Sequence, residues 1–174
     1  PSMLKLDPPD HSRIRKLVQY GFTNRYITSL EPEIKKVVDS CLDRVHNQNS
    51  FDLIEDLAKP LPAIVIAKMM GLPNEDLDQF QAWSEDLLVG VGGIGTSRED
   101  IKKSGDAYEA LISYFEKIIL TRKDSPGDDF IGKLIQAEEE GDKLNIKEMY
   151  GTCLLLLIAG HETTTRLIGN GMFT

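Results

Sequence analysis

The sequence predicts an all-helical fold, and two observations support this prediction. Apolar residues recur at spacings of three and four along almost the whole chain, which is the period of a helix with one buried face. The segments between these runs are short and contain proline, glycine or a capping residue, and no segment convincingly indicates a strand. We expect about seven helices, and a chain of 174 residues is long enough to bury a sizeable core.

Four helices are expected in the first half of the chain. The first follows Pro8-Pro9-Asp10 and ends at Thr23-Asn24, and the second runs from Thr28 or Ser29 to Val45. The third runs from Phe51 to Met70, and the fourth starts at Asn74 and continues through Leu88. Phe22 is expected on the buried side of the first helix. The third helix should kink or stop at Pro60 and Pro62, because proline lacks the N–H that a helix interior needs.

Three more helices are expected in the second half, from about Arg98 to Leu120, from Asp128 to Glu140, and from Asn145 to Thr174. Asn145 can cap the last helix while Glu148 reaches back to it, and Leu144 can pack on Met149. The glycine-rich loop 90–96 contains valine and isoleucine, so it is either a lid over a lipophilic site or a plain connector.

The composition limits the partners and the location of the protein. A net charge of −8 disfavours nucleic acid or anionic lipid as a partner. Cys41 and Cys153 lie far apart in helical runs, which indicates neither a disulfide framework nor a metal site, so a reducing, cytoplasmic location is expected. No run of apolar residues is long enough to cross a membrane.

The last helix contains an unusual polar segment, Ala159-Gly160-His161-Glu162-Thr163-Thr164, directly after an apolar run. Ala159 and Gly160 lack bulk, so a flat ligand could approach the backbone there, while Glu162 could relay a proton and Thr163 could form a hydrogen bond. The alternative is structural: Glu162 pairs with Arg166, and the threonines bond to carbonyls one turn back. A zinc-peptidase motif is excluded, because Thr165 stands where its second histidine would be.

A second candidate group lies at the start of the first helix. His11 and Arg15 are four residues apart and share a face near a helix N-terminus, where the helix dipole favours an anion. Arginine binds carboxylate or phosphate through two parallel hydrogen bonds. The alternative is that His11 is a cap or surface residue and that the basic cluster is a solvated face.

Together, these two groups resemble the cytochrome P-450 family of haem-thiolate monooxygenases. The sequence D-P-P-x-H-x-x-x-R followed by F-T, and then A-G-H-E-T-T, occurs in the order of that family. The segments Phe51 to Pro73 and Asp128-Asp129-Phe130 also resemble its soluble bacterial members, so that the resemblance covers nearly the whole chain.

The resemblance implies specific roles. His11 and Arg15 would bind the propionates of haem b, and Ala159 and Gly160 would lie against the haem. Glu162 and Thr163 would be the acid–alcohol pair that delivers protons during O2 activation. The segment from about Asn74 to Ser104 would roof the pocket for a small lipophilic substrate, and a ferredoxin- or flavodoxin-type partner would supply electrons from NAD(P)H.

The sequence also departs from the family pattern. The family holds its iron through a cysteine in a glycine-containing loop and needs a Glu-x-x-Arg helix before it, and the 174 residues contain neither. We therefore expect one incomplete domain, 1–174, that binds no metal, holds no haem in the catalytic manner and is inactive alone. Apolar faces left bare would favour self-association. The rival hypothesis is a haemless helical module for interaction or dimerisation.

Overall fold

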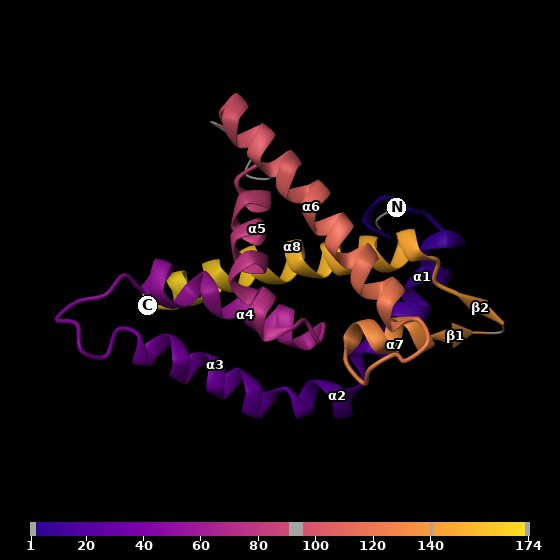
Figure 1. The fold of residues 1–174 in the computed structure, drawn as a ribbon, viewed down its shortest axis with the longest axis horizontal. Helices are drawn as coiled ribbons and strands as arrows, with labels where there is room; N and C mark the ends of the chain where they lie inside the picture. The colour runs from indigo at the N-terminus through magenta and orange to yellow at the C-terminus, as the bar shows by residue number, and fades with distance from the viewer. Residues whose placement is uncertain (1–2, 91–95, 140, 173–174) are drawn as a thin grey trace.

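A computed structural model describes residues 3–90, 96–139 and 141–172 and confirms the all-helical prediction (Figure 1). The α-helices are α1 (Asp10–Gln19), α2 (Asn24–Ser29), α3 (Glu31–Asp43), α4 (Pro60–Met69), α5 (Leu77–Val89), α6 (Arg98–Arg122), α7 (Phe130–Gln136) and α8 (Ile146–Gly171). Shorter turns of helix are η1 (Met3–Lys5), η2 (Tyr20–Phe22), η3 (Ile54–Ala58, a π-helix) and η4 (Asn74–Asp76). None of the described helices is long and apolar enough to cross a membrane.

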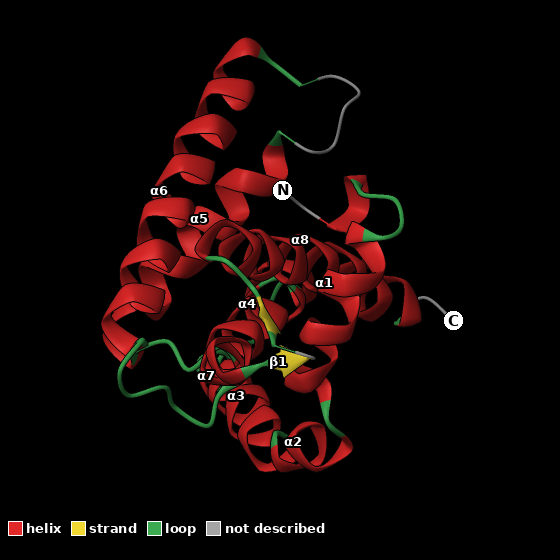
Figure 2. Cartoon of the chain, turned by 90° about the vertical axis from the view of Figure 1, so that its right-hand side faces the viewer, coloured by secondary structure: helices red, strands yellow, loops and turns green. Residues whose placement is uncertain are grey.

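The helix α8 is the centre of the arrangement. Figure 1 shows it along the long axis of the molecule, with the pair α5 and α6 on one side and α2 and α3 on the other. It packs against α4 and α6, and one continuous core joins α1 and the helices from α4 to α8. Figure 2 shows the same molecule from the side, with β1 (Glu138–Glu139), which lies at the edge of the helices in Figure 1, facing the viewer.

The start of α8 follows the local sequence signal. The Asn145 side chain accepts a hydrogen bond from the Glu148 backbone N–H at 3.0 Å, and the Glu148 carboxylate accepts one from the Asn145 N–H at 2.8 Å. Leu144 and Met149 are both buried in the core, as a hydrophobic staple would have them. The helix then continues without interruption through Ala159 to Thr164. The polar segment therefore interrupts the run of apolar residues but not the helix.

Three boundaries differ from the sequence prediction. Helix α2 was not predicted, and the expected second helix corresponds to α3, which starts later, at Glu31, with Pro32 in its first turn. The expected sixth helix ends at Gln136, and β1 (Glu138–Glu139) pairs antiparallel with β2 (Asp142–Lys143) around Gly141, whose φ of 82° suits a tight turn. Phe22 lies beyond α1 and is 41% exposed, so its predicted burial was wrong.

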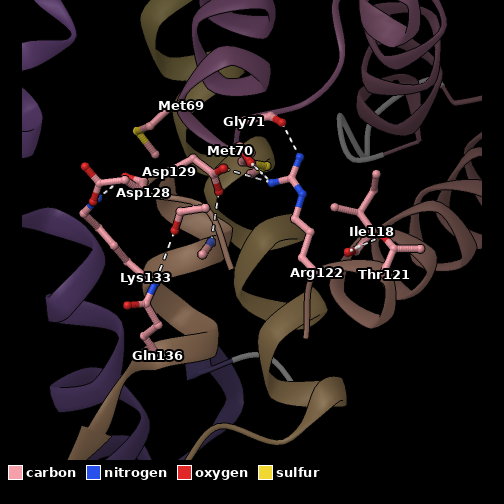
Figure 3. Close-up of polar contacts among 12 residues, drawn as sticks. Met69, Met70, Gly71, Ile118, Thr121, Arg122, Asp128, Asp129, Lys133 and Gln136 are labelled. Atoms are coloured by element: carbon pink, nitrogen blue, oxygen red, sulfur yellow. Dashed lines mark hydrogen bonds and ion pairs between the residues drawn. The ribbon is translucent and has the colours of Figure 1, made fainter. Parts of the chain in front are cut away.

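A partly buried arginine joins the ends of three helices (Figure 3). The Arg122 guanidinium donates to the Met70 carbonyl at 3.3 Å, to the Gly71 carbonyl, and to the Asp129 carboxylate at 3.0 Å. The other oxygen of Asp129 caps α7 by accepting from the Gly132 N–H at 2.9 Å. Gly71, with φ at 70°, has no side chain to collide with Asp129. This contact fixes the ends of α4 and α6 against the start of α7.

Candidate functional site

One side of α8 is open along much of its length. Leu155, Ala159, Thr163 and Leu167 follow one another at intervals of four residues, which places them on one stripe of the helix. Ala159 and Thr163 are exposed, and Leu167 is 72% exposed. The opposite side is buried, as Leu157 and His161 show. The structure therefore puts two of the predicted site residues on an open stripe of small and apolar side chains.

Glu162 and Thr163 make the contacts that the structural alternative predicted. The Thr163 hydroxyl donates to the Ala159 carbonyl one turn back at 2.5 Å, and the Glu162 carboxylate pairs with the Arg166 guanidinium. The Arg166 side chain is 71% exposed, and such exposed pairs contribute about 0–1 kcal/mol. Because both contacts are local and weak, they leave the carboxylate and the hydroxyl free to exchange partners.

Gly160 has a packing reason that the sequence did not reveal. A Cβ at this position would lie 2.9 Å from Cδ1 of Ile66, so the missing side chain lets α8 approach α4 closely. Gly160 thus faces α4, whereas Ala159 belongs to the open stripe. The sequence prediction placed both residues against one ligand, but the structure turns them in different directions.

Two side chains of α8 bind carbonyl groups at the junction of η3 and α4. The Ala58 carbonyl would accept from residue 62 in a regular helix, but Pro62 has no N–H to donate. The Thr165 hydroxyl lies 2.9 Å from this carbonyl and 2.9 Å from the His161 carbonyl one turn back, so it shares its proton between the two acceptors. The His161 Nε2–H donates to the Lys59 carbonyl at 3.0 Å. The predicted interruption at the prolines is therefore confirmed, and the His161 and Thr165 side chains join α8 to this junction.

The imidazole of His161 is 2% exposed, and burial lowers its pKa from the ordinary value of 6.5. The folded state thus binds this proton more weakly than the unfolded state does. The contribution to stability is complete above pH 6.5 and is lost as the pH falls from there to the folded pKa. We expect the free energy of unfolding to fall by up to about 1.4 kcal/mol per pH unit in that window.

Urea denaturation at a series of pH values measures this slope. The control is His161→Gln, which removes the titration but keeps a side-chain N–H for the Lys59 carbonyl. The variant should show a smaller slope below pH 6.5; equal slopes for the two proteins would contradict the assignment.

His11 and Arg15 lie on α1, where His11 is half-buried and Arg15 is exposed. Within the described part of the chain, neither side chain makes a hydrogen bond or an ion pair. The neighbouring Arg13 does: it binds Asp142 at 3.2 Å and the Glu148 carboxylate at the start of α8. Arg13 thus fixes α1 beside the first turn of α8 and leaves His11 and Arg15 available.

The structure does not join the two predicted groups directly. Ala159 lies thirteen residues after Ile146, which is about 20 Å along the helix axis. Figure 1 shows α1 beside the opposite, N-terminal end of α8. A ligand that used both groups would have to be large, with anionic groups toward α1 and a flat body along α8.

A cavity of about 360 Å³ was not foreseen from the sequence. It lies between α5, α6 and α8, and its lining consists of Lys59, Glu85, Asp86, Leu88, Val89, Lys103, His161, Glu162, Thr165 and Arg166. Most of these residues are charged, and no spacing in the sequence connects α5 with α8. The predicted lid falls largely on residues 91–95, which lie outside the described residues, so the lid stays a prediction.

Comparison with known proteins identifies what the chain resembles. The sequence profile described as Cytochrome P450 matches residues 2–173. A Bacillus subtilis protein named Cytochrome P450 is 40% identical over 97% of this chain and 40% of its own length. The Vitamin D(3) 25-hydroxylase of Pseudonocardia autotrophica is 38% identical over 99% of this chain and 41% of its own length.

The crystal structure of CYP109E1 from Bacillus megaterium in complex with testosterone has the same fold. It aligns with a TM-score of 0.90 and 38% identity, and the alignment covers 99% of this chain and 46% of that one. The chain thus spans less than half the length of the relatives it matches.

Proposed function

The chain belongs to the cytochrome P450 family, and we propose that it forms the central helical portion of a monooxygenase that hydroxylates a small lipophilic substrate. The observation that carries this proposal is the open stripe of α8, where Ala159 and Thr163 are exposed on a helix that is otherwise mostly enclosed. A vitamin D(3) hydroxylase and a testosterone complex among the relatives support a lipophilic substrate.

His11, Arg15 and Ala159 suit the propionates and the ring of haem, but the described residues offer no ligand for its iron. Haem has two propionates and a flat apolar ring, and when bound it supplies the O2 and redox chemistry of the family. His11 and Arg15 would hold the propionates, since both offer N–H donors that no described residue occupies. Ala159 would lie against the ring, because its small side chain lets a flat group approach the helix.

The acid–alcohol pair would move protons. Glu162 would give up a proton toward the Thr163 hydroxyl, which donates to one partner while it accepts from another. The weak pairing of Glu162 with Arg166 would hold the carboxylate near the open stripe without trapping it. The electrons would come from NAD(P)H through a ferredoxin- or flavodoxin-type protein, and the cytoplasmic location stays a prediction.

Neither cysteine in the 174 residues suits an iron ligand. Burial raises the pKa of the Cys153 thiol to about 12, whereas the thiolate is the form that binds metal. Cys41 is likewise buried, within α3. The described residues contain no cluster of three or more histidine, cysteine, aspartate or glutamate residues that could hold a metal ion.

We therefore expect the 174-residue chain, mixed with haem, reduced and exposed to carbon monoxide, to lack the absorption band of thiolate-ligated haem. The matched control is a longer chain that carries the family's glycine-flanked cysteine, which should show the band. A thiolate band from the 174 residues alone would contradict the proposal that neither Cys41 nor Cys153 binds the iron. Absence of the band from the longer chain would contradict the function itself.

Self-association of the isolated chain also stays a prediction. Leu167 is 72% exposed and Met172 is 69% exposed, both near the C-terminal end of α8. These side chains favour burial against other protein, and they are the observation that keeps the haemless interaction module as the second candidate.

A further inference from the structure

A second cavity, of about 480 Å³, lies where the end of α6, α7 and the start of α8 meet. Figure 1 shows these elements at the end of the molecule that carries the strands, away from the C-terminal half of α8. The volume falls within the range of about 300–1,000 Å³ that is usual for small-molecule sites. None of the lining residues belongs to the predicted haem or oxygen site, so the cavity is a separate feature of the fold.

The walls of this cavity are mainly apolar, and they consist of Ile119, Leu120, Ile135, Leu144, Ile146 and Met149. Ile119, Leu144 and Met149 belong to the buried core, so packing fixes their positions. Leu120 is 57% exposed. Leaving this side chain in water is unfavourable, and contact with an apolar ligand would remove part of its surface from water. The walls therefore suit an alkyl chain.

The charged side chains of the lining are both lysines. Lys123 lies at the end of α6, is exposed, and makes no side-chain hydrogen bond or ion pair with any described residue. Lys143 binds Glu138 at 2.9 Å, but the two side chains are 60% and 49% exposed, so this pair is weak and can exchange. No carboxylate lines this cavity, whereas three line the cavity between α5, α6 and α8. The lining thus favours an anionic group, although the protein as a whole has a net charge of −8.

We propose that this cavity binds a single-chain alkyl carboxylate, with the chain against the apolar walls and the carboxylate at Lys123 and Lys143. The two parts of such a ligand match the two parts of the lining, which neither a plain hydrocarbon nor a small anion does. An exposed ion pair contributes about fivefold to affinity at most. Each buried CH2 group contributes roughly fourfold. The chain therefore supplies most of the affinity, and the carboxylate fixes the orientation.

The length of the chain gives the first test. Octanoate, decanoate and dodecanoate are titrated, below the concentrations at which they form micelles, into the full-length, haem-loaded protein in a calorimeter. Saturating phenylimidazole, which binds the haem iron, keeps these ligands out of the substrate pocket. We expect one bound decanoate per protein, and each step of two CH2 groups should tighten binding roughly 5- to 15-fold until the cavity is full.

The charge of Lys123 gives the second test. Lys123→Gln should weaken decanoate binding roughly fivefold. The matched control is Lys117→Gln, which removes the same charge from an exposed position of α6 that does not line the cavity, and it should leave the affinity unchanged. Decan-1-ol has the same chain without the charge, so it should bind equally to the unaltered protein and to Lys123→Gln. Both lysines are exposed, so the two variants should keep the melting temperature of the unaltered protein.

The remaining outcomes are decisive as well. A full-length protein that binds no decanoate would overturn the inference, as it would if another part of the whole protein covered the cavity. Equal weakening by Lys123→Gln and Lys117→Gln would show that decanoate responds to net charge and not to this cavity. Binding to phosphatidylglycerol vesicles that depends on Lys123, without binding of free decanoate, would assign the surface to a membrane and overturn the inference. A protein that binds decanoate as expected but forms no product from any lipophilic substrate would contradict only the proposed function.

Discussion

In the full-length, haem-loaded protein, we expect Thr163→Ala to lower product formed per O2 consumed by roughly 100-fold, which is the effect of removing a positioned proton donor. The reason lies in the geometry of α8. Thr163 is the exposed hydroxyl of the open stripe, one turn after Ala159, and its hydrogen bond to the Ala159 carbonyl is local enough to be exchanged. No other described contact of its side chain would account for such a loss. Simultaneous assays of product and O2 measure the ratio.

Two controls make the Thr163 result specific. Thr163→Ser keeps the hydroxyl and should restore most of the coupling. Thr164→Ala removes the same atoms one position further along, on a half-buried face of α8, and should leave the ratio close to that of the unaltered protein. Equal coupling in Thr163→Ala and Thr164→Ala, with equal haem content, would refute the role of Thr163.

We expect Phe130→Ala to lower the free energy of unfolding by about 3–5 kcal/mol, because it leaves a cavity where a fully buried ring was. Phe130 begins α7 and is 0% exposed, and its ring fills the space above Gly21, where a Cβ would lie 2.5 Å from it. The loss should appear in urea denaturation followed by circular dichroism.

The matched control for this prediction is Phe22→Ala. The two rings meet edge to face with their centroids 5.0 Å apart, so either variant removes the same aromatic contact. Phe22 is 41% exposed, and its loss should cost only about 1 kcal/mol. Similar losses in both variants would show that the contact, and not burial, sets the energy.

Signals within a few residues of each other allowed the elements to be predicted. The capping box of Asn145 and Glu148 starts α8, and the prolines at 60 and 62 interrupt the helix before α4. The same kind of reasoning failed where the local sequence is compatible with two structures. Residues 137–140 were predicted to continue the sixth helix, but Gly141 allows a turn, and β1 pairs with β2 instead.

The site could be predicted only in part. The motifs identified Ala159, Glu162 and Thr163 as candidates, and helical spacing placed Ala159 and Thr163 on one face, as observed. Spacing could not tell which face would be covered. It therefore missed that Gly160 turns toward Ile66, and that His161 is buried with one nitrogen unsatisfied among the described residues.

The sequence by itself determined most of the helices of this protein, the cap of α8 and the family, because those depend on residues that are close along the chain or on motifs in a fixed order. The tertiary structure decided what each side of α8 faces. The bond from His161 to the Lys59 carbonyl and the bond from Thr165 to the Ala58 carbonyl span 102 and 107 residues, and the second exists because Pro62 leaves its acceptor free. Such contacts depend on how α8 packs against α4, and the period of a helix carries no information about its partner.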